Sequence, residues 1–285
     1  MFTSILVPYV NERSETNVLE SALAIAADLQ FSFKPHKAAA HLAVLIGIEM
    51  PVMLPDMWSS SGSGILLCDA ADAHAKTLQA RIAQRTKYGA VLPEIRLEHA
   101  AGDSAAKMAA LHARYSDISI VPSASGTDSA IAHHYFSALL MHSGRPVLTI
   151  PEAYTLADTP KRVVIAWQPT RETTRAVHDA MPFLQAAETV DVLIVDPEVN
   201  NDAHGQDPGT DIATQLARHG LHVKVVCVKS SGKSVALAIN GYLAHAGAHL
   251  LVAGGYGHSR LQEFLLGGVT RELLQTAAIP VLFSH

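Results

Sequence analysis

The sequence predicts an α/β protein made of two repeated, open, five-stranded parallel sheets. Short runs of Val, Ile and Leu alternate with longer stretches of helical periodicity, and this order occurs twice along the 285 residues. Apolar residues make up 49% of the chain and charged residues 16%, so the chain can fill the cores of two ordinary domains.

Five strands are expected in each half, in a Rossmann-like arrangement. The runs are nearly continuous in apolar residues, which is typical of parallel strands covered by helices on both faces. In the first half we expect strands at residues 3–9, 41–49, 93–99, 118–122 and 146–150. In the second half we expect strands at residues 162–167, 190–196, 222–228, 249–254 and 280–284. Apolar residues at helical spacing from Ala176 to Ala187 predict one amphipathic helix between the first two of these.

Three matches in the same order indicate an internal duplication. Residues 4–8 resemble residues 162–166 at the start of each half, and residues 145–148 resemble residues 279–282 at the end. Gly102-Asp103-Ser104 and Gly232-Lys233-Ser234 each follow a third strand and open a helix. We therefore expect one repeat over 1–152 and another over 160–285. Such repeats are expected to pack against each other as an intramolecular pseudo-dimer, and pairing of two whole chains into a homodimer stays open.

A glycine-rich segment after the fourth strand of the second half predicts an anion site. Gly254, Gly257 and Gly267 follow the spacing Gly-x2-Gly-x9-Gly, and a helix begins near Gly268. Glycines let backbone amides approach a ligand, and a helix start adds unpaired N–H donors and the positive end of its dipole. The candidate nucleotide-binding residues are Gly254, Gly257, His258, Ser259, Arg260, Gly267, Gly268, Val269, Thr270 and Gln168. The segment is not a P-loop, because it lacks the Gly-Lys-Ser/Thr ending.

This motif, closed by Val269-Thr270 and followed by Pro280-Val281-Leu282, resembles the universal stress protein family. The resemblance covers nearly the whole chain as two tandem copies and is clearer in the second. It implies paired five-stranded domains and, in some members, a bound adenine nucleotide. The family's phosphate-binding positions correspond to Gly254, Gly257, Gly267, Gly268 and Val269.

The chain departs from the family pattern at two places in the second repeat. The motif usually ends Gly-Ser or Gly-Thr, whereas Gly268 stands at the hydroxyl position, which keeps the amide and loses one hydrogen bond to phosphate. An aspartate that contacts the nucleoside usually follows the first strand. Gln168 stands there in the second repeat and can still hydrogen-bond, whereas Val10 in the first repeat cannot.

The first repeat is expected to have lost its phosphate loop. Alignment back from Pro146 places His133 and His134 where the second repeat has Gly267 and Gly268. Side chains there would block a close backbone approach. We interpret the two histidines as partly exposed residues at a helix end.

Several other features of the sequence are interpreted as structural rather than as catalytic or metal-binding. Cys68 and Cys227 are expected to be buried thiols rather than a disulfide framework. The 16 histidines show no metal-ligand spacing, so no metal site is expected. The Met-rich stretch at 50–64 is interpreted as a surface loop packed on the neighbouring repeat, with a contact surface or lid as the alternative.

The chain is expected to be cytoplasmic and to bind neither membranes nor nucleic acid. It begins without a basic signal region, and its net charge is −5 without a cluster of Lys and Arg.

The resemblance implies a stress-response protein that binds ATP, ADP or AMP, with or without Mg²⁺, in its second repeat. Such a protein would be a nucleotide-responsive regulator with at most slow ATP hydrolysis, acting on a protein partner that the sequence does not identify. One alternative is a structural or adaptor protein that has lost nucleotide binding. An enzyme of the related adenine-nucleotide-binding class ranks last, because its Ser-Gly-Gly-x-Asp-Ser and His-x-Gly-His patterns are missing.

Overall fold

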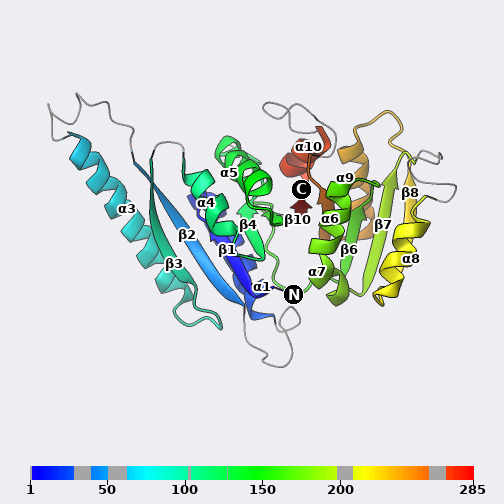
Figure 1. The fold of residues 1–285 in the computed structure, drawn as a ribbon, viewed down its shortest axis with the longest axis horizontal. Helices are drawn as coiled ribbons and strands as arrows, with labels where there is room; N and C mark the ends of the chain where they lie inside the picture. Colours follow the sequence, from blue (N-terminus) through cyan, green and yellow to red (C-terminus); the bar gives the residue numbers. More distant parts are fainter. Residues whose placement is uncertain are drawn as a thin grey trace.

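The computed structural model describes residues 2–28, 40–50, 63–101, 104–126, 128–197, 208–256 and 268–285. Within these ranges it is an α/β protein with one ten-stranded sheet (Figure 1). The strands of the first half are β1 (Ser4–Pro8), β2 (His41–Met50), β3 (Glu94–Ala101), β4 (Ile118–Pro122) and β5 (Val147–Ile150). Those of the second half are β6 (Arg162–Ala166), β7 (Thr189–Val195), β8 (Val223–Val228), β9 (Leu250–Gly254) and β10 (Val281–Ser284). Each predicted strand occurs within two residues of its predicted ends.

The helices connect consecutive strands. In the first half they are α1 (Glu12–Ala27), α3 (Ser63–Thr86), α4 (Ala105–Ala113) and α5 (Ser129–His142). In the second half they are α6 (Arg171–Asp179), α7 (Met181–Ala186), α8 (Thr210–Arg218), α9 (Val235–Ala246) and α10 (Gly268–Thr276). The single helix predicted over 176–187 is divided at Ala180, because Pro182 lacks an amide donor and is best placed in the first turn of a new helix.

The strand order is β3-β2-β1-β4-β5-β10-β9-β6-β7-β8, and each half is parallel within itself. The two halves meet where β5 and β10 pair antiparallel, with Leu148 opposite Leu282. The predicted fold of two parallel repeats packed as a pseudo-dimer is therefore confirmed.

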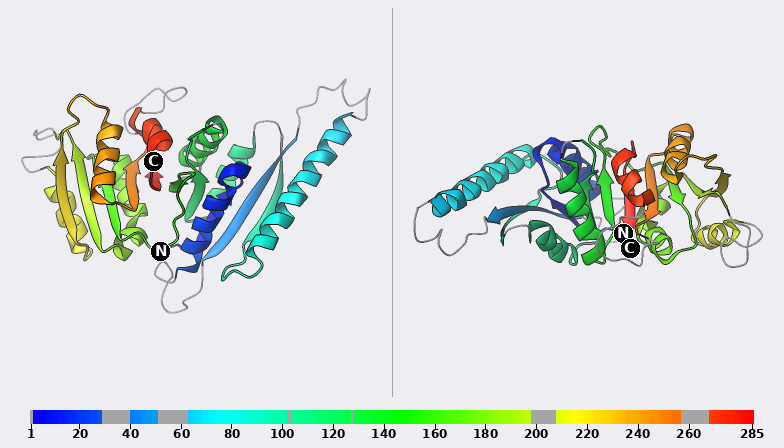
Figure 2. Two further views of the ribbon diagram at one scale, coloured as in Figure 1. Left: turned by 180° about the vertical axis from the view of Figure 1, so that it is seen from behind. Right: turned by 90° about the horizontal axis from the view of Figure 1, so that it is seen from above.

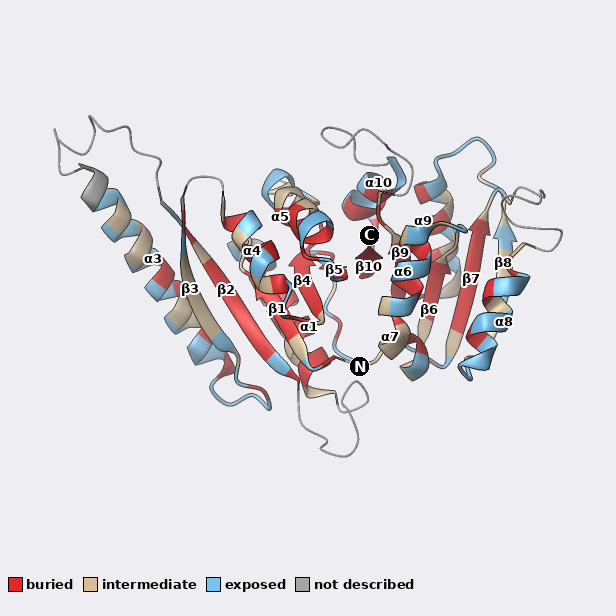
Figure 3. Cartoon of the chain, viewed as in Figure 1, coloured by how far each residue is buried: buried red, intermediate tan, exposed pale blue. Residues whose placement is uncertain are grey.

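Two apolar cores lie on opposite faces of this sheet, and each spans both halves. One lies beneath α1, α3 and α6–α8, and the other beneath α4, α5, α9 and α10. The views from behind and from above show helices on both sides of the twisted sheet (Figure 2). The central strands are buried along their lengths, whereas the outer sides of the helices are exposed (Figure 3). Within the described ranges, no helix is long and apolar enough to cross a membrane.

The expected burial of both cysteines is wrong. Cys227 is exposed and Cys68 is partly exposed. Cys227 lies on β8, which ends the sheet and has a partner strand on one side only. The side chains of such an edge strand are covered less completely than those of central strands. The Met-rich stretch lies mostly outside the described residues, because only its two ends, in β2 and α3, are described.

The contact of Phe136 with Phe283 joins the two repeats on the α5–α10 face. The ring centroids are 5.1 Å apart in an edge-to-face arrangement, and both side chains are fully buried. Phe283→Ala removes this ring and leaves a cavity, so we expect the free energy of unfolding to fall by about 3–5 kcal/mol in urea denaturation. Tyr115→Ala is the control, because Tyr115 is 86% exposed, and its effect should stay within about 0.5 kcal/mol. Equal effects of the two substitutions would contradict the assignment of this contact to the core.

Candidate functional site

The predicted binding corner lies where the strands of the second repeat end. β6 and β9 are neighbours, with Ala166 opposite Ala253, so the residues that follow both strands share one edge of the sheet. Gln168 follows β6 at this edge, is exposed, and accepts a 2.8 Å hydrogen bond at its carbonyl from the Thr170 amide. Ligands of open α/β sheets bind at such carboxyl-terminal edges. The structure thus brings Gln168 and Gly254 to the same edge.

Gly254 allows α6 to pack closely on β9. A methyl group at Gly254 would lie 2.6 Å from the Thr173 amide nitrogen and 2.9 Å from the Glu172 carbonyl carbon. The first turn of α6 is held in this place by Thr170, whose hydroxyl accepts a 3.3 Å hydrogen bond from the Thr173 amide. A side chain at Gly254 would therefore push the start of α6 away from the sheet.

The start of α10 presents two of the predicted residues to solvent. Gly268 is the first residue of the helix and is exposed, and among the described residues no heavy atom lies within 4 Å of the position that a methyl group would take. Val269 is 39% exposed. The first amides of a helix have no partner within the helix, and the helix dipole is positive at this end. The first turn of α10 is therefore a suitable place for an anion.

Thr270 has a different role from that of its two predecessors. Its side chain is 5% exposed, and its hydroxyl accepts a 3.3 Å hydrogen bond from the amide of Tyr256. The same residue pair connects the segment after β9 to the first turn of α10. In this structure the Thr270 hydroxyl fixes the backbone and does not face solvent.

Gly257, His258, Ser259, Arg260 and Gly267 lie outside the described residues. Their assignment as nucleotide-binding residues stays a prediction.

The sequence interpretation did not single out Asp196, which lies directly after β7 at the same edge. Its backbone has a positive φ of 49°, and its carboxylate accepts a 2.9 Å hydrogen bond from the Ser230 amide. Hydrogen bonds from the side chain and the amide of Ser230 lower the pKa of Asp196. The carboxylate is therefore ionised at neutral pH. Its place right after a buried strand was the signal that could have identified it.

The corresponding connection of the first repeat is short and leads directly into α5. α5 begins at Ser129, so His133 and His134 lie in its second turn, and their interpretation as helix-end residues is wrong. The connection between β4 and α5, residues 123–128, is less than half as long as the connection between β9 and α10, residues 255–267. Residues of α5 therefore stand at the sequence positions that align with the end of the glycine loop. Burial lowers the pKa of His133, and the charge of Arg271 on α10 adds to this effect.

The space beside Val10 in the first repeat is also small. Tyr9, Val10 and Glu15 line a void of about 20 Å³, which is room for about one water molecule. Arg81 of α3 forms an ion pair with the nearly buried carboxylate of Glu15 and lies 3.5 Å from the Tyr9 hydroxyl. Among the described residues, protein side chains therefore leave little free space beside Val10.

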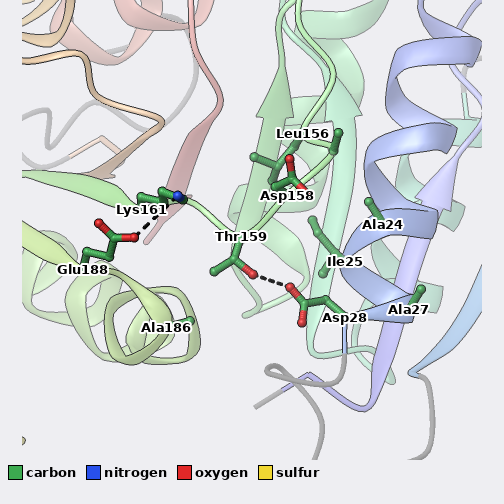
Figure 4. A pocket seen from close by; sticks show the side chains of 11 residues that line it. Ala24, Ile25, Ala27, Asp28, Leu156, Asp158, Thr159, Lys161, Ala186 and Glu188 are labelled. Atoms are coloured by element: carbon green, nitrogen blue, oxygen red, sulfur yellow. Dashed lines mark hydrogen bonds and ion pairs between the residues drawn. The ribbon is translucent and has the colours of Figure 1, made fainter.

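A cavity of about 720 Å³ lies at the other end of the strands, between the last turn of α1, residues 156–161 and the end of α7 (Figure 4). Four polar side chains in its walls form two pairs. The Thr159 hydroxyl donates to the Asp28 carboxylate, and Lys161 Nζ lies 3.6 Å from Glu188 Oε1. This cavity is separate from the predicted binding corner.

Residues 160–285 match the model of the universal stress protein family. The second repeat therefore carries the sequence pattern of the universal stress protein family. No curated protein sequence matches the chain.

Two solved structures share the fold over almost the whole chain. The structure of a universal stress protein from Archaeoglobus fulgidus DSM 4304 matches with a TM-score of 0.71 and 16% identity, covering 99% of this chain and 95% of that one. A functionally unknown protein from Pseudomonas aeruginosa PAO1 matches with a TM-score of 0.55 and 16% identity, covering 99% and 92% of the two chains. At this level of identity the likeness concerns the fold.

The two described glycines of the motif should respond differently to a methyl group. Gly254→Ala forces a contact with the α6 backbone, so we expect a loss of about 1–3 kcal/mol in the free energy of unfolding. Gly268→Ala meets no atom of the described residues at a helix start, so the change should stay within about 0.5 kcal/mol or stabilise the protein. Urea denaturation of both variants tests this assignment, and tolerance of alanine at Gly254 would refute the packing role.

Proposed function

We propose that the second repeat binds an adenine nucleotide at the corner formed by the ends of β6 and β9 and the start of α10. The observation that carries the proposal is the open first turn of α10, exposed at Gly268 and Val269, at the edge of the sheet where such folds bind ligands. The match of the second repeat to the universal stress protein family supports the same assignment.

The phosphate groups are assigned to the start of α10. Unpaired amides at Gly268 and Val269 can donate to phosphate oxygens, and the helix dipole favours the negative charge. The predicted loop residues Gly257, His258, Ser259, Arg260 and Gly267 precede this helix in the chain and would complete the site. A loop closed by glycines brings its backbone near a ligand without steric cost.

The nucleoside is assigned to the edge near Gln168 and Asp196. Gln168 offers both a donor and an acceptor, and the ionised carboxylate of Asp196 accepts hydrogen bonds from hydroxyl or amino groups. These two residues follow the neighbouring strands β6 and β7. They provide the polar contacts that the aspartate after the first strand supplies in the family pattern.

The proposed role is a nucleotide-responsive regulator of the stress response that acts in the cytoplasm. We assign no catalytic residue, so the bound state itself, with or without Mg²⁺, would change the contact with a protein partner. Under this proposal ATP hydrolysis is at most slow.

A structural or adaptor role without nucleotide is the second candidate. Gly254 and Thr270 favour it, because each already has a role in packing or in backbone hydrogen bonding. Under this alternative the glycine loop is kept but no longer binds a nucleotide.

Heat denaturation with ATP, ADP or AMP, each with and without Mg²⁺, separates the two roles. A nucleotide present at about 100 times its dissociation constant should stabilise the protein by about 2.7 kcal/mol and raise Tm accordingly. The absence of any shift with all three nucleotides would favour the adaptor role. Steady release of phosphate above background would instead indicate an enzyme.

Substitutions at Gly268 test the phosphate assignment. Gly268→Ser restores the hydroxyl of the family pattern, and we expect ATP to bind about two- to tenfold more tightly, as one hydrogen bond would give. Gly268→Asp places a negative charge at the helix start, which is compatible with the dipole but repels phosphate, so ATP binding should be lost while the fold is kept. Titration calorimetry measures both affinities, and urea denaturation checks that stability is preserved. Unchanged affinity in both variants would refute the assignment of phosphate to α10.

A further inference from the structure

Tyr256 follows β9 in a backbone conformation that side chains rarely adopt. Its φ is 64°, whereas most residues with positive φ in the described part of the chain are glycines. Such a residue persists only where its surroundings hold it in place. The Tyr256 amide donates to the Thr270 hydroxyl at 3.3 Å, and the Tyr256 hydroxyl lies 3.1 Å from the hydroxyl of Ser137.

The Tyr256 side chain contacts His285 of its own repeat, and its hydroxyl partner belongs to the other repeat. Ser137 lies on α5, as does Phe136, whose ring centroid is 6.4 Å from that of Tyr256. Leu140, one turn further along α5, lies so close to Gly255 that a methyl group there would be 2.6 Å from its Cδ2 atom. Helix α5 of the first repeat therefore contacts the start of the glycine loop of the second repeat.

The pseudo-symmetric position in the first repeat lacks this side chain. Ser123 and Gly255 each follow the fourth strand of their repeat, and their amides donate to Ile150 and Ser284 of the last strands at 2.9 and 2.8 Å. The next residue is Ala124 in the first repeat and Tyr256 in the second. The Ala124 amide donates to the Leu274 carbonyl of α10 at 3.1 Å, and its methyl side chain has no hydroxyl to donate or accept. The side-chain link across the interface thus occurs on the side that keeps the glycine loop.

We propose that Tyr256 is a positioning residue for the nucleotide site of the second repeat and that Ser137 of the first repeat holds it there. Tyr256 is fixed at its hydroxyl by α5 and at its amide by Thr270 in the first turn of α10. The chain entering the loop and the helix that receives the phosphates are thereby connected. The first repeat, whose own connection after β4 is short, serves as the support for the corner of the second. This inference rests on the proposed nucleotide binding.

Removing either hydroxyl should weaken nucleotide binding. For Tyr256→Phe and Ser137→Ala we expect the dissociation constant for ATP with Mg²⁺ to rise about three- to tenfold in titration calorimetry, the range given by one lost hydrogen bond. The double variant should be no weaker than either single one, because both remove the same interaction. Ser137→Thr keeps the hydroxyl and should retain the affinity of the unmodified protein.

Thr149→Val is the matched control. The Thr149 hydroxyl is buried on β5 and donates at 3.2 Å to the Val281 carbonyl of β10, so it also joins the two repeats, through these two strands rather than through Tyr256. Its loss should lower the free energy of unfolding and leave the affinity for ATP unchanged. An equal loss of affinity in Thr149→Val and Ser137→Ala would overturn the proposal, because interface stability alone would then explain both.

Amide hydrogen exchange without nucleotide separates this inference from the proposed function. Ser137→Ala should accelerate exchange at Tyr256 and in the first turn of α10, whereas Thr149→Val should not. Unchanged exchange at these amides in Ser137→Ala would overturn the anchoring by the first repeat. Failure of the unmodified protein to bind ATP, together with the expected exchange result, would refute the proposed function and leave the anchoring standing.

Discussion

The antiparallel pairing of β5 with β10 is the contact on which the rest of the molecule depends. Three residue pairs along these short strands turn two parallel sheets into one continuous sheet and remove two unpaired edges. Each face of the joined sheet then has one apolar core that runs through both repeats. The same pairing places α5 beside α10, so the start of the glycine loop contacts the first repeat (Figure 1).

The two repeats share a fold but differ at their binding corners for physical reasons. In the first repeat a short connection leads straight into a long α5, and Arg81, Glu15 and Tyr9 fill the neighbouring space. In the second repeat a longer connection leads to a shorter α10 whose first turn is open at Gly268. The two repeats thus have corresponding edges that differ in the length of the connection to the last helix.

The glycines of the motif illustrate why a motif alone does not define roles. Gly254 is required by the close approach of α6, whereas no atom of the described residues lies near the position of a methyl group at Gly268. Gly254 is one of the three spaced glycines, and Gly268 stands directly after the last of them. Thr270, which follows in the same motif, has its hydroxyl engaged by Tyr256, although its residue type suggested a contact with ligand. The structural role of each of these residues therefore depends on the tertiary contacts around it.

By itself, the sequence predicted the order and approximate ends of the strands and their arrangement in two parallel repeats. These follow from local periodicity and spacing, because burial on both faces of a parallel strand requires a continuous apolar run. The tertiary structure alone decided that Cys227 is exposed at an edge strand, that His133 lies within α5, and that Tyr256 contacts Ser137. These features depend on which strands end the sheet and which helices meet across it, and such contacts join residues far apart in the chain.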